Sequence, residues 1–305
     1  MSEIDQQIIP GDLPMFNPNK PILIVGTGVM GSLVAWATAR TGIPVHAFDA
    51  QPGKAMTALK QALTWSEGEE RSLVERNFQV FESLDKAVKS VQMAFENVFE
   101  DVDVKRELLE KLGALLSRET YMGSNTSSLV CSKLAASSGR PDRFFNMNFT
   151  DPRTSRLVEL MGCPETAVQS LVFARAWARH IGMVPITVNK EQMGYSFNRL
   201  WRVIKKEVLR QVAEGYAKPE DIDRAWMLSF DMSYGPCGLM DMVSLPTIAK
   251  VEQQYYLDSG DPTDCPPEFL EQMIEAGKHG VVSGEGFYRY PDPAYRKPGW
   301  LDEES

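Results

Sequence analysis

The stretch Ile22-Leu-Ile-Val25-Gly26-Thr-Gly28-Val-Met-Gly31 decides the fold of this chain. A short apolar run, typical of a buried strand, leads directly into a G-x-G-x-x-G turn, and the small, Ala-rich segment from Ser32 to Arg40 predicts a helix. Glycine suits the turn because the chain bends tightly, the backbone must approach a pyrophosphate, and the helix must pack closely on the strand. The stretch therefore predicts a dinucleotide-binding βαβ unit.

An acidic residue supports this interpretation. The second predicted strand, Val45-His-Ala-Phe48, ends at Asp49, where a carboxylate can bind ribose hydroxyls and repel a 2′-phosphate. The first N–H groups of the helix, at Val29 and Met30, would hold the pyrophosphate. NAD(H) is favoured over NADP(H). A glycine motif alone can be an ordinary loop, and a flavin nucleotide is the competing ligand, but no other segment supports a flavin.

The composition narrows the class of protein. The chain has 305 residues, 43% of them hydrophobic, and a formal net charge of -9, which suits a globular protein of two domains. It has no Lys/Arg-rich run and no apolar run long enough for a bilayer, so we expect neither nucleic acid nor membrane as a partner. The acidic start lacks the features of a signal peptide, and a cytoplasmic protein is expected. The chain has four cysteines, Cys131, Cys163, Cys237 and Cys265. Their spacing shows no pairs, which argues against disulfides and against a zinc site.

Strand and helix patterns alternate in the first two thirds of the chain. Further strands are expected at 78–81, 91–95, 120–123, 144–149, 157–161 and 183–188, with helices between them at 104–116 and 165–180. Alternation of this kind predicts a parallel, doubly wound sheet of the Rossmann type. The expected organisation is a tail at 1–20, an NAD-binding domain at 21–190 and an all-helical domain for substrate binding and dimerisation at 191–305.

The C-terminal part has a helical pattern only. Apolar residues recur there at helical spacing over about 20 residues, and they are Phe197, Leu200, Trp201, Ile204, Val208 and Val212. Further helices are expected from Pro219, near 248–257 and near 269–276. A small helical domain rarely covers such a long apolar face alone, so a homodimer joined through this part is predicted.

Several motifs follow one another along the chain. They are Phe95-Glu-Asn-Val-Phe-Glu100 with Lys105, Asn125-Thr-Ser127-Ser-Leu129, Leu157-Val-Glu159, Phe197-Asn198-Arg-Leu200, Glu214-Gly215 with Asp221-Ile-Asp223, Gly235-Pro236, and Gly284-Glu-Gly-Phe-Tyr288. In this order, from about Pro21 to Tyr290, the chain resembles the 3-hydroxyacyl-CoA dehydrogenase family. The resemblance implies that the cofactor is held by the following residues: Gly26, Gly28, Gly31, Glu100, Lys105, Asn125 and Ser127. It also implies that Ser127 and Asn198 hydrogen-bond the substrate oxygen.

The departures from the family pattern lie at the expected reaction centre. The family has a histidine general base oriented by the glutamate of Leu-Val-Glu, here Glu159, and the histidine position holds Asn148. The motif asparagine that faces the nicotinamide corresponds to Asp151, and a lysine near the C-terminal Gly-rich motif becomes Val282. The region between Asp49 and Glu100, which forms a helical hairpin that touches CoA in the family, is shorter. A CoA thioester is therefore less expected than in the family, and small hydroxy acids are a sensible comparison.

An amide cannot exchange a proton near neutral pH, so the proton relay needs another group. Asp151 and Glu159 are the acids of the matched segment, and a carboxylate whose pKa is raised by burial could serve. Alternatively, Glu159 only completes a hydrogen-bond network and Asp151 is a solvated loop residue. His46 is expected to be structural, and His180 is expected to be a surface residue or a residue at the end of a helix rather than a base. His279 lies in a Gly-rich turn that could approach the cleft, but a catalytic role is not favoured for it.

Three functions remain open from the sequence. The first is an NAD-dependent oxidoreductase that interconverts a 3-hydroxyacyl group or small hydroxy acid and its 3-oxo form, with an altered proton relay. The second is a non-catalytic NAD-binding homologue that lost its base. The third is a biosynthetic enzyme with a non-CoA substrate, free or linked to an acyl carrier. No metal is expected in any of them.

Overall fold

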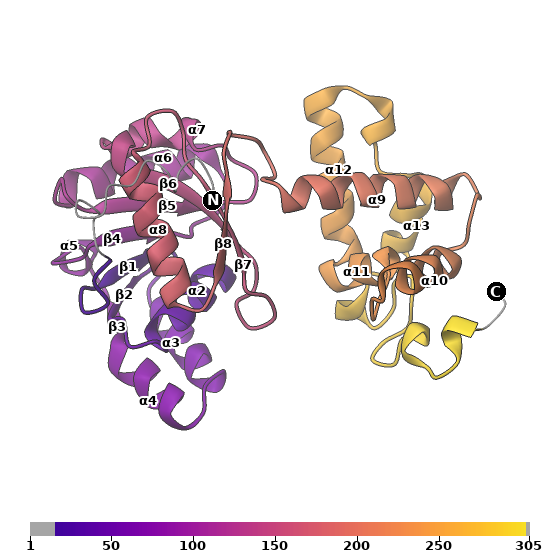
Figure 1. The fold of residues 1–305 in the computed structure, drawn as a ribbon, viewed down its shortest axis with the longest axis horizontal. Helices are drawn as coiled ribbons and strands as arrows, with labels where there is room; N and C mark the ends of the chain where they lie inside the picture. Colours follow the sequence, from indigo (N-terminus) through magenta and orange to yellow (C-terminus); the bar gives the residue numbers. More distant parts are fainter. Residues whose placement is uncertain (1–15, 303–305) are drawn as a thin grey trace. The chain divides into compact units, whose positions relative to one another are not determined.

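The computed structural model describes residues 16–302, and the chain divides into two compact units, Met1–Asn198 and Arg199–Ser305 (Figure 1). Most of the tail expected at 1–20, residues 1–15, lies outside the described part. The first unit carries all the strands of the sheet and the second is helical. The predicted fold class, a Rossmann-type domain followed by a helical domain, is confirmed.

The first unit is built on one eight-stranded sheet in the order β3-β2-β1-β4-β5-β6-β7-β8. The strands are β1 (Ile22–Val25), β2 (Val45–Phe48), β3 (Phe78–Phe81), β4 (Met93–Glu96), β5 (Tyr121–Asn125), β6 (Phe144–Phe149), β7 (Leu157–Met161) and β8 (Val184–Val188). The order reverses between β1 and β4, which pair in parallel with Val25 opposite Glu96. In such sheets ligands bind outside the carboxyl ends of the strands at this reversal.

One pairing differs from the parallel sheet that the sequence predicted. Strands β6 and β7 are antiparallel, because the loop between Phe149 and Leu157 is too short for a crossover connection. The resulting register places Asn148 directly opposite Glu159. The departure from a parallel sheet thus brings together the two residues on which the chemistry of the site was expected to depend.

Helices cover both faces of the sheet (Figure 1). One face is packed by α2 (Val29–Ala39), α3 (Lys54–Thr64), α4 (Gly68–Asn77) and α8 (Val168–His180); the other is packed by α5 (Leu84–Ala87), α6 (Val102–Leu115) and α7 (Ser132–Ala135). The central strand β1 is buried along its whole length, which explains its continuous apolar run. The sheet therefore provides a rigid base for the loops at its carboxyl end.

The second unit consists of five helices and short 3₁₀ turns in the described residues. Helix α9 (Phe197–Ala213) starts at the end of the first unit, and α10 (Pro219–Phe230), α11 (Pro236–Val243), α12 (Leu245–Ser259) and α13 (Glu268–Glu275) follow. Their common core includes Leu209, Met227, Met240, Ile248 and Leu270. No helix within residues 16–302 is both long and apolar enough to cross a membrane.

One buried carboxylate, Asp223, connects several of the C-terminal motifs. Asp223 accepts hydrogen bonds from the backbone N–H groups of Cys237 and Gly238 and from the Tyr288 hydroxyl. A Cβ atom at Gly235 would lie 2.4 Å from the Asp223 carboxyl group, so that position requires glycine. Burial raises the pKa of Asp223, and these donors oppose the rise. In the described structure the motif residues Asp223, Gly235 and Tyr288 therefore form a folding network.

Candidate active site

A cavity of about 710 Å³ lies at the carboxyl end of the sheet in the first unit. It is bounded by the glycine turn after β1, by Asp49 after β2, and by the segments that end β4, β5 and β6. Of the site residues expected from the sequence, the cavity wall contains Gly26, Gly28, Met30, Asp49, Glu100, Asn125, Ser127 and Asn148. The structure therefore brings most of the expected cofactor residues and Asn148 to one place.

The glycine turn leaves room for a phosphate group. Gly26 has a positive φ of 82°, and a Cβ atom at Gly31 would lie 1.9 Å from the Gly26 carbonyl oxygen. At Gly28 a Cβ atom would meet no atom within 4 Å, so the turn is open on that side. Gly28 is also the N-cap of α2, and no side chain caps the helix there. These features fit a pyrophosphate bound at the free N–H groups of Val29 and Met30.

Asp49 is held in a fixed orientation at the end of β2. The backbone N–H and the hydroxyl of Thr27 donate to Asp49 Oδ2 at 2.7 and 3.1 Å, and the N–H of Gln51 donates to Oδ1 at 2.9 Å. The carboxylate is therefore preorganised next to the glycine turn. Its place fits the ribose hydroxyls of NAD and opposes a 2′-phosphate.

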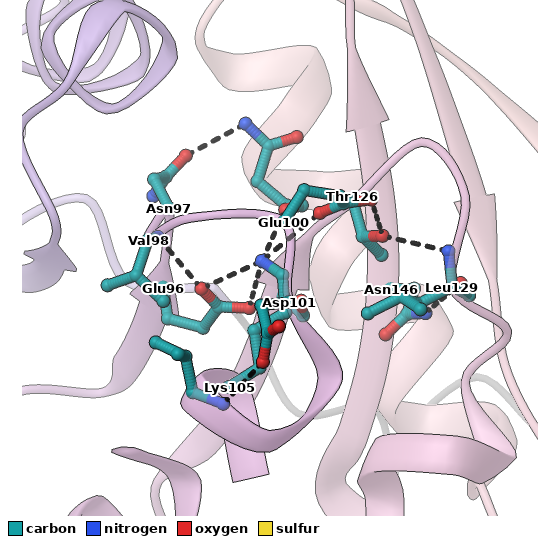
Figure 2. Close-up of polar contacts among 12 residues, drawn as sticks. Glu96, Asn97, Val98, Glu100, Asp101, Lys105, Thr126, Leu129 and Asn146 are labelled. Carbon is teal, nitrogen blue, oxygen red and sulfur yellow. Dashed lines mark hydrogen bonds and ion pairs between the residues drawn. The ribbon is translucent and has the colours of Figure 1, made fainter. Parts of the chain in front are cut away.

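A buried ion pair lies beneath the cavity (Figure 2). Lys105 Nζ donates to both carboxylate oxygens of Glu96, at 2.8 and 3.1 Å, and to the carbonyl oxygen of Asn125 at 3.0 Å. Both side chains of the pair are fully buried. Burial raises the pKa of Glu96, whereas Lys105 and Ser124 oppose the rise. Lys105 is thus placed to support the end of β5 and does not line the cavity, and its contact with the cofactor, which the resemblance implies, stays a prediction.

Glu100 fixes the loop that carries Ser127 (Figure 2). Its Oε1 atom accepts hydrogen bonds from the Thr126 hydroxyl at 2.5 Å and from the N–H groups of Ser127 and Ser128, both at 3.1 Å. Burial alone would raise the pKa of Glu100, but the hydrogen bond from Thr126 and the charge of Lys105 outweigh it, so the pKa is lowered. The ionised Glu100 therefore positions the loop at the cavity wall.

Sequence reasoning assigned no role to three of these residues. Glu96 and Thr126 stand inside the Phe95–Glu100 and Asn125–Leu129 motifs, and a signal was present because Glu96 ends β4 and Thr126 follows β5 directly. Ser128 also donates its hydroxyl to Glu100 Oε1 at 2.8 Å. Their roles depend on contacts between segments far apart in the sequence, which spacing does not show.

Asn148 and Glu159 are in direct contact. Asn148 Nδ2 donates to Glu159 Oε2 at 3.2 Å, and Glu159 Oε1 accepts the N–H groups of Ser196 and Phe197, both at 2.9 Å. Glu159 is 1% exposed and is absent from the cavity wall, whereas Asn148 lines the cavity. The carboxylate therefore lies behind the amide and orients it. Asn198 follows Phe197 in the first turn of α9 and does not line this cavity.

Asp151 has a different environment from the one expected of a proton carrier. Arg153 binds it with two side-chain nitrogens, Nη2 lying 2.6 Å from Oδ2 and Nε 3.0 Å from Oδ1. The hydrogen bonds from Arg153 hold the pKa of Asp151 below its usual value despite partial burial. The raised pKa that an acid near neutrality needs is therefore not found at Asp151.

None of the three histidines, all within the described residues, lines the cavity. His46 Nδ1 lies 2.7 Å from the Ala87 carbonyl oxygen, and burial lowers its pKa. His279 Nε2 lies 3.1 Å from the Ile274 carbonyl oxygen, and the His180 ring packs on Phe16. Within residues 16–302 no group of three His, Cys, Asp or Glu side chains is placed to hold a metal ion.

A Rossmann-type sheet with a glycine turn and an acidic second strand end, followed by a helical unit, defines the class of two-domain nicotinamide-dependent dehydrogenases. The model of the 3-hydroxyacyl-CoA dehydrogenase NAD-binding domain matches residues 21–192, and that of the C-terminal domain of the same family matches residues 194–290. The chain belongs to the 3-hydroxyacyl-CoA dehydrogenase family, and its cofactor is NAD.

The proteins to which this chain is similar are named after different substrates. The probable 3-hydroxybutyryl-CoA dehydrogenase of Bacillus subtilis (strain 168) is 30% identical, over 90% of this chain and 98% of the relative. The 5-formyl-3-hydroxy-2-methylpyridine 4-carboxylate 5-dehydrogenase of Mesorhizobium japonicum is 29% identical, over 88% and 90%. The structure of a diketoreductase that acts on dicarbonyl compounds aligns with a TM-score of 0.82 at 29% identity, over 90% of this chain and all of the other.

Replacing Asp49 by serine should reduce the preference for NAD over NADP. We expect the unaltered protein to bind NAD at least about tenfold more tightly, about 1.4 kcal/mol, and the variant to bind both within about threefold. Dissociation constants from fluorescence titration of each cofactor measure this. Glu107→Gln, which removes another acidic group from the cavity wall, is the matched control and should keep the preference. Equal affinity of the unaltered protein for both cofactors would contradict the role of Asp49.

Proposed function

We propose that the protein is an NAD-dependent oxidoreductase that interconverts a hydroxyl and an oxo group on a 3-hydroxyacyl compound or a small hydroxy acid. The observation that carries the proposal is the contact between Asn148, on the wall of the NAD cavity, and the buried Glu159 behind it. The family to which the chain belongs consists of NAD-dependent dehydrogenases that act on CH–OH groups. The carboxylate fixes an amide donor where a substrate oxygen can bind.

The cofactor residues and the substrate residues have separate tasks in this proposal. Bound NAD would supply the hydride chemistry, while the protein provides binding and orientation. The N–H groups of Val29 and Met30 would hold the pyrophosphate beside Gly26, Gly28 and Gly31, and Asp49 would hold the ribose. Ser127 and Asn125, positioned by Glu100 and Lys105, would form the wall between cofactor and substrate.

Asn148 would stabilise negative charge on the substrate oxygen. A carboxamide has two N–H donors, and one of them is directed to Glu159. The second remains for a substrate oxygen, with the Ser127 hydroxyl as a further donor and Asn198 as a further positioning group. A fixed donor of this kind stabilises an oxyanion more than a mobile one does, because no reorganisation is needed during the reaction.

The proton would be exchanged with water in the cavity. Asn148 cannot carry a proton, and Glu159 is engaged by three donors and lies behind the cavity wall. Asp151 is the weaker alternative because its pair with Arg153 lowers its pKa. Glu159 would therefore polarise the Asn148 amide without transferring a proton itself.

A panel of substrates tests this function. Free 3-hydroxy acids, their CoA thioesters and the corresponding 3-oxo compounds would be incubated with NAD or its reduced form, and the absorbance of the reduced nicotinamide followed. Turnover of any of them supports the proposal and shows whether the substrate is CoA-linked. A protein that binds NAD tightly but turns over none of them would be the non-catalytic homologue, which the amide at position 148 also fits.

Asn148→His should change the dependence of kcat/KM on pH. Neither a histidine nor a cysteine is among the described residues that line the cavity, so we expect kcat/KM to vary less than about threefold between pH 6 and 8. A histidine beside Glu159 would introduce a titration at or above about pH 6.5, because the carboxylate favours the imidazolium. Initial rates from pH 5.5 to 9 measure both profiles, with Asp151→Asn as the control that should leave the profile unchanged. A bell-shaped profile in the unaltered protein that is lost in Asp151→Asn would restore Asp151 as the relay.

A homodimer is a further part of the proposal. Leu200 and Val203 on α9 are 64% and 67% exposed, although Val208 and Leu209 of the same helix are buried in the core of the second unit. The apolar face of α9 is thus only partly covered within the described chain. A second copy of the chain is the partner that we propose for the exposed part.

A further inference from the structure

Two cysteines that the sequence left unpaired meet in the first unit. Cys131 lies just after the loop that carries Ser127, and Cys163 follows β7, the strand that carries Glu159. Their sulfur atoms approach the same hydroxyl group, since Thr166 Oγ1 lies 3.3 Å from Cys163 Sγ and 4.0 Å from Cys131 Sγ. We call Cys131 and Cys163 the dithiol pair.

A tight turn holds Cys163 and Thr166 together. The N–H of Cys163 donates to Thr166 Oγ1 at 2.9 Å, and the N–H of Thr166 donates to the Cys163 carbonyl oxygen at 2.9 Å. Gly162 makes the turn possible, because a Cβ atom there would lie only 3.0 Å from the Thr166 Cβ. The position of Cys163 beside Cys131 is therefore fixed by the backbone.

The two thiols are chemically unequal. The hydrogen bond from Cys131 lowers the pKa of Cys163 to about 7, although burial acts in the opposite direction. The same contact and burial raise the pKa of Cys131. Thr166 can also give its one hydroxyl proton to Cys163 Sγ, in place of the Phe144 carbonyl oxygen 2.9 Å away. When one thiol of the pair ionises, the negative charge therefore resides on Cys163 and the proton on Cys131.

We propose that the dithiol pair is a site of reversible oxidation by peroxides. The Cys163 thiolate attacks one oxygen of hydrogen peroxide, the O–O bond breaks, and hydroxide leaves, giving Cys163 sulfenic acid. The Cys131 thiol then attacks the sulfenic sulfur, its proton leaves with the oxygen as water, and a disulfide forms. The two electrons come from the two sulfurs, and peroxide is the oxidant.

Exposure sets the order of the two steps. Cys163 is 8% exposed and Cys131 is completely buried, so a small oxidant reaches Cys163 first. The resulting bridge would join the segment that follows Ser127 to the end of the strand that bears Glu159. A thiol reductant would reverse it.

The test uses the full chain with Cys265→Ser, because Cys265 is exposed and would react by itself. The protein is treated with hydrogen peroxide and quenched, and its thiols are alkylated under denaturing conditions. We expect the loss of two thiols, a mass lower by two hydrogens, and a peptide that links Cys131 to Cys163. Cys237, which is buried in α11, should remain a free thiol and serves as the internal control.

Single substitutions separate the two roles. In Cys131→Ser the reaction should stop at a sulfenic acid on Cys163, which dimedone traps, and in Cys163→Ser neither a sulfenic acid nor a bridge should form. In the parent protein the rate of thiol loss should rise about tenfold from pH 6 to 8 and then level off, as a thiol with a pKa near 7 requires. Thiol loss without a Cys131–Cys163 link, or equal trapping of Cys131 in Cys163→Ser, would overturn the proposal.

Discussion

Replacing Lys105 by methionine should lower the free energy of unfolding by about 3–5 kcal/mol, because it leaves the Glu96 carboxylate buried without its counter-charge. Both side chains are completely buried, and Lys105 also donates to the Asn125 carbonyl oxygen. Urea unfolding at neutral pH measures the change. Lys111→Met on the same helix, which removes an exposed pair with Glu107, is the matched control and should leave the free energy of unfolding almost unchanged.

The pH dependence of this loss has a definite sign. Burial already raises the pKa of Glu96, and removing the ammonium group raises it further. A carboxyl group whose pKa is higher in the folded state supports folding below its unfolded pKa, about 4.3, and this support is lost as the pH rises through the folded pKa. The variant should therefore lose more stability at pH 8 than at pH 5. The double variant Lys105→Met with Glu96→Gln should recover part of the loss, and no recovery would mean that the two charges do not act as a pair.

Replacing Gly31 by alanine should both destabilise the first unit and abolish tight NAD binding. The new methyl group would lie 1.9 Å from the Gly26 carbonyl oxygen, and this neighbour is backbone, so α2 must move away from the turn. We expect a loss of about 2–3 kcal/mol of stability and at least about a 100-fold increase in the NAD dissociation constant. Urea unfolding and fluorescence titration with NAD measure the two effects.

Gly28→Ala is the informative comparison. A methyl group there meets no protein atom within 4 Å, but it enters the space at the start of α2 that the pyrophosphate needs. This variant should keep its stability within about 0.5 kcal/mol and still lose NAD affinity. If Gly28→Ala bound NAD normally, the pyrophosphate could not lie against the start of α2.

The sequence alone predicts those parts of the fold that depend on local patterns of apolar residues and glycines. The run Ile22–Val25 with its glycine turn predicted β1, α2 and the NAD site, and the fold class and the cofactor were confirmed. The antiparallel pairing of β6 and β7 was not predicted, because alternating elements suggest parallel strands and only the short loop before Leu157 indicates otherwise. The residues of the ion pair under the cavity were partly recognised: Lys105 was expected to touch the cofactor, and Glu96 was given no role.

The site departs from expectation where a residue's role depends on a loop conformation or on contacts between distant segments of the chain. The effect of Arg153 on Asp151 depends on the conformation of an exposed loop, which the sequence pattern does not define. The approach of Cys131 and Cys163 to the same Thr166 hydroxyl depends on the tertiary fold, so cysteine spacing could not reveal it. Roles that rest on such contacts become visible only with the three-dimensional structure.

The position of Glu159 at the start of α9 has a consequence for how this lineage can evolve. The carboxylate accepts the N–H groups of Ser196, just before α9, and of Phe197, the first residue of this seventeen-residue helix, and a negative charge there also favours the helix dipole. Selection for a folded chain would thus retain this glutamate even in a descendant that had lost all turnover. Retention of Glu159 in such a descendant would therefore reflect its role in folding. Loss of activity would instead be accompanied by substitutions at Asn148 and Ser127, which line the cavity.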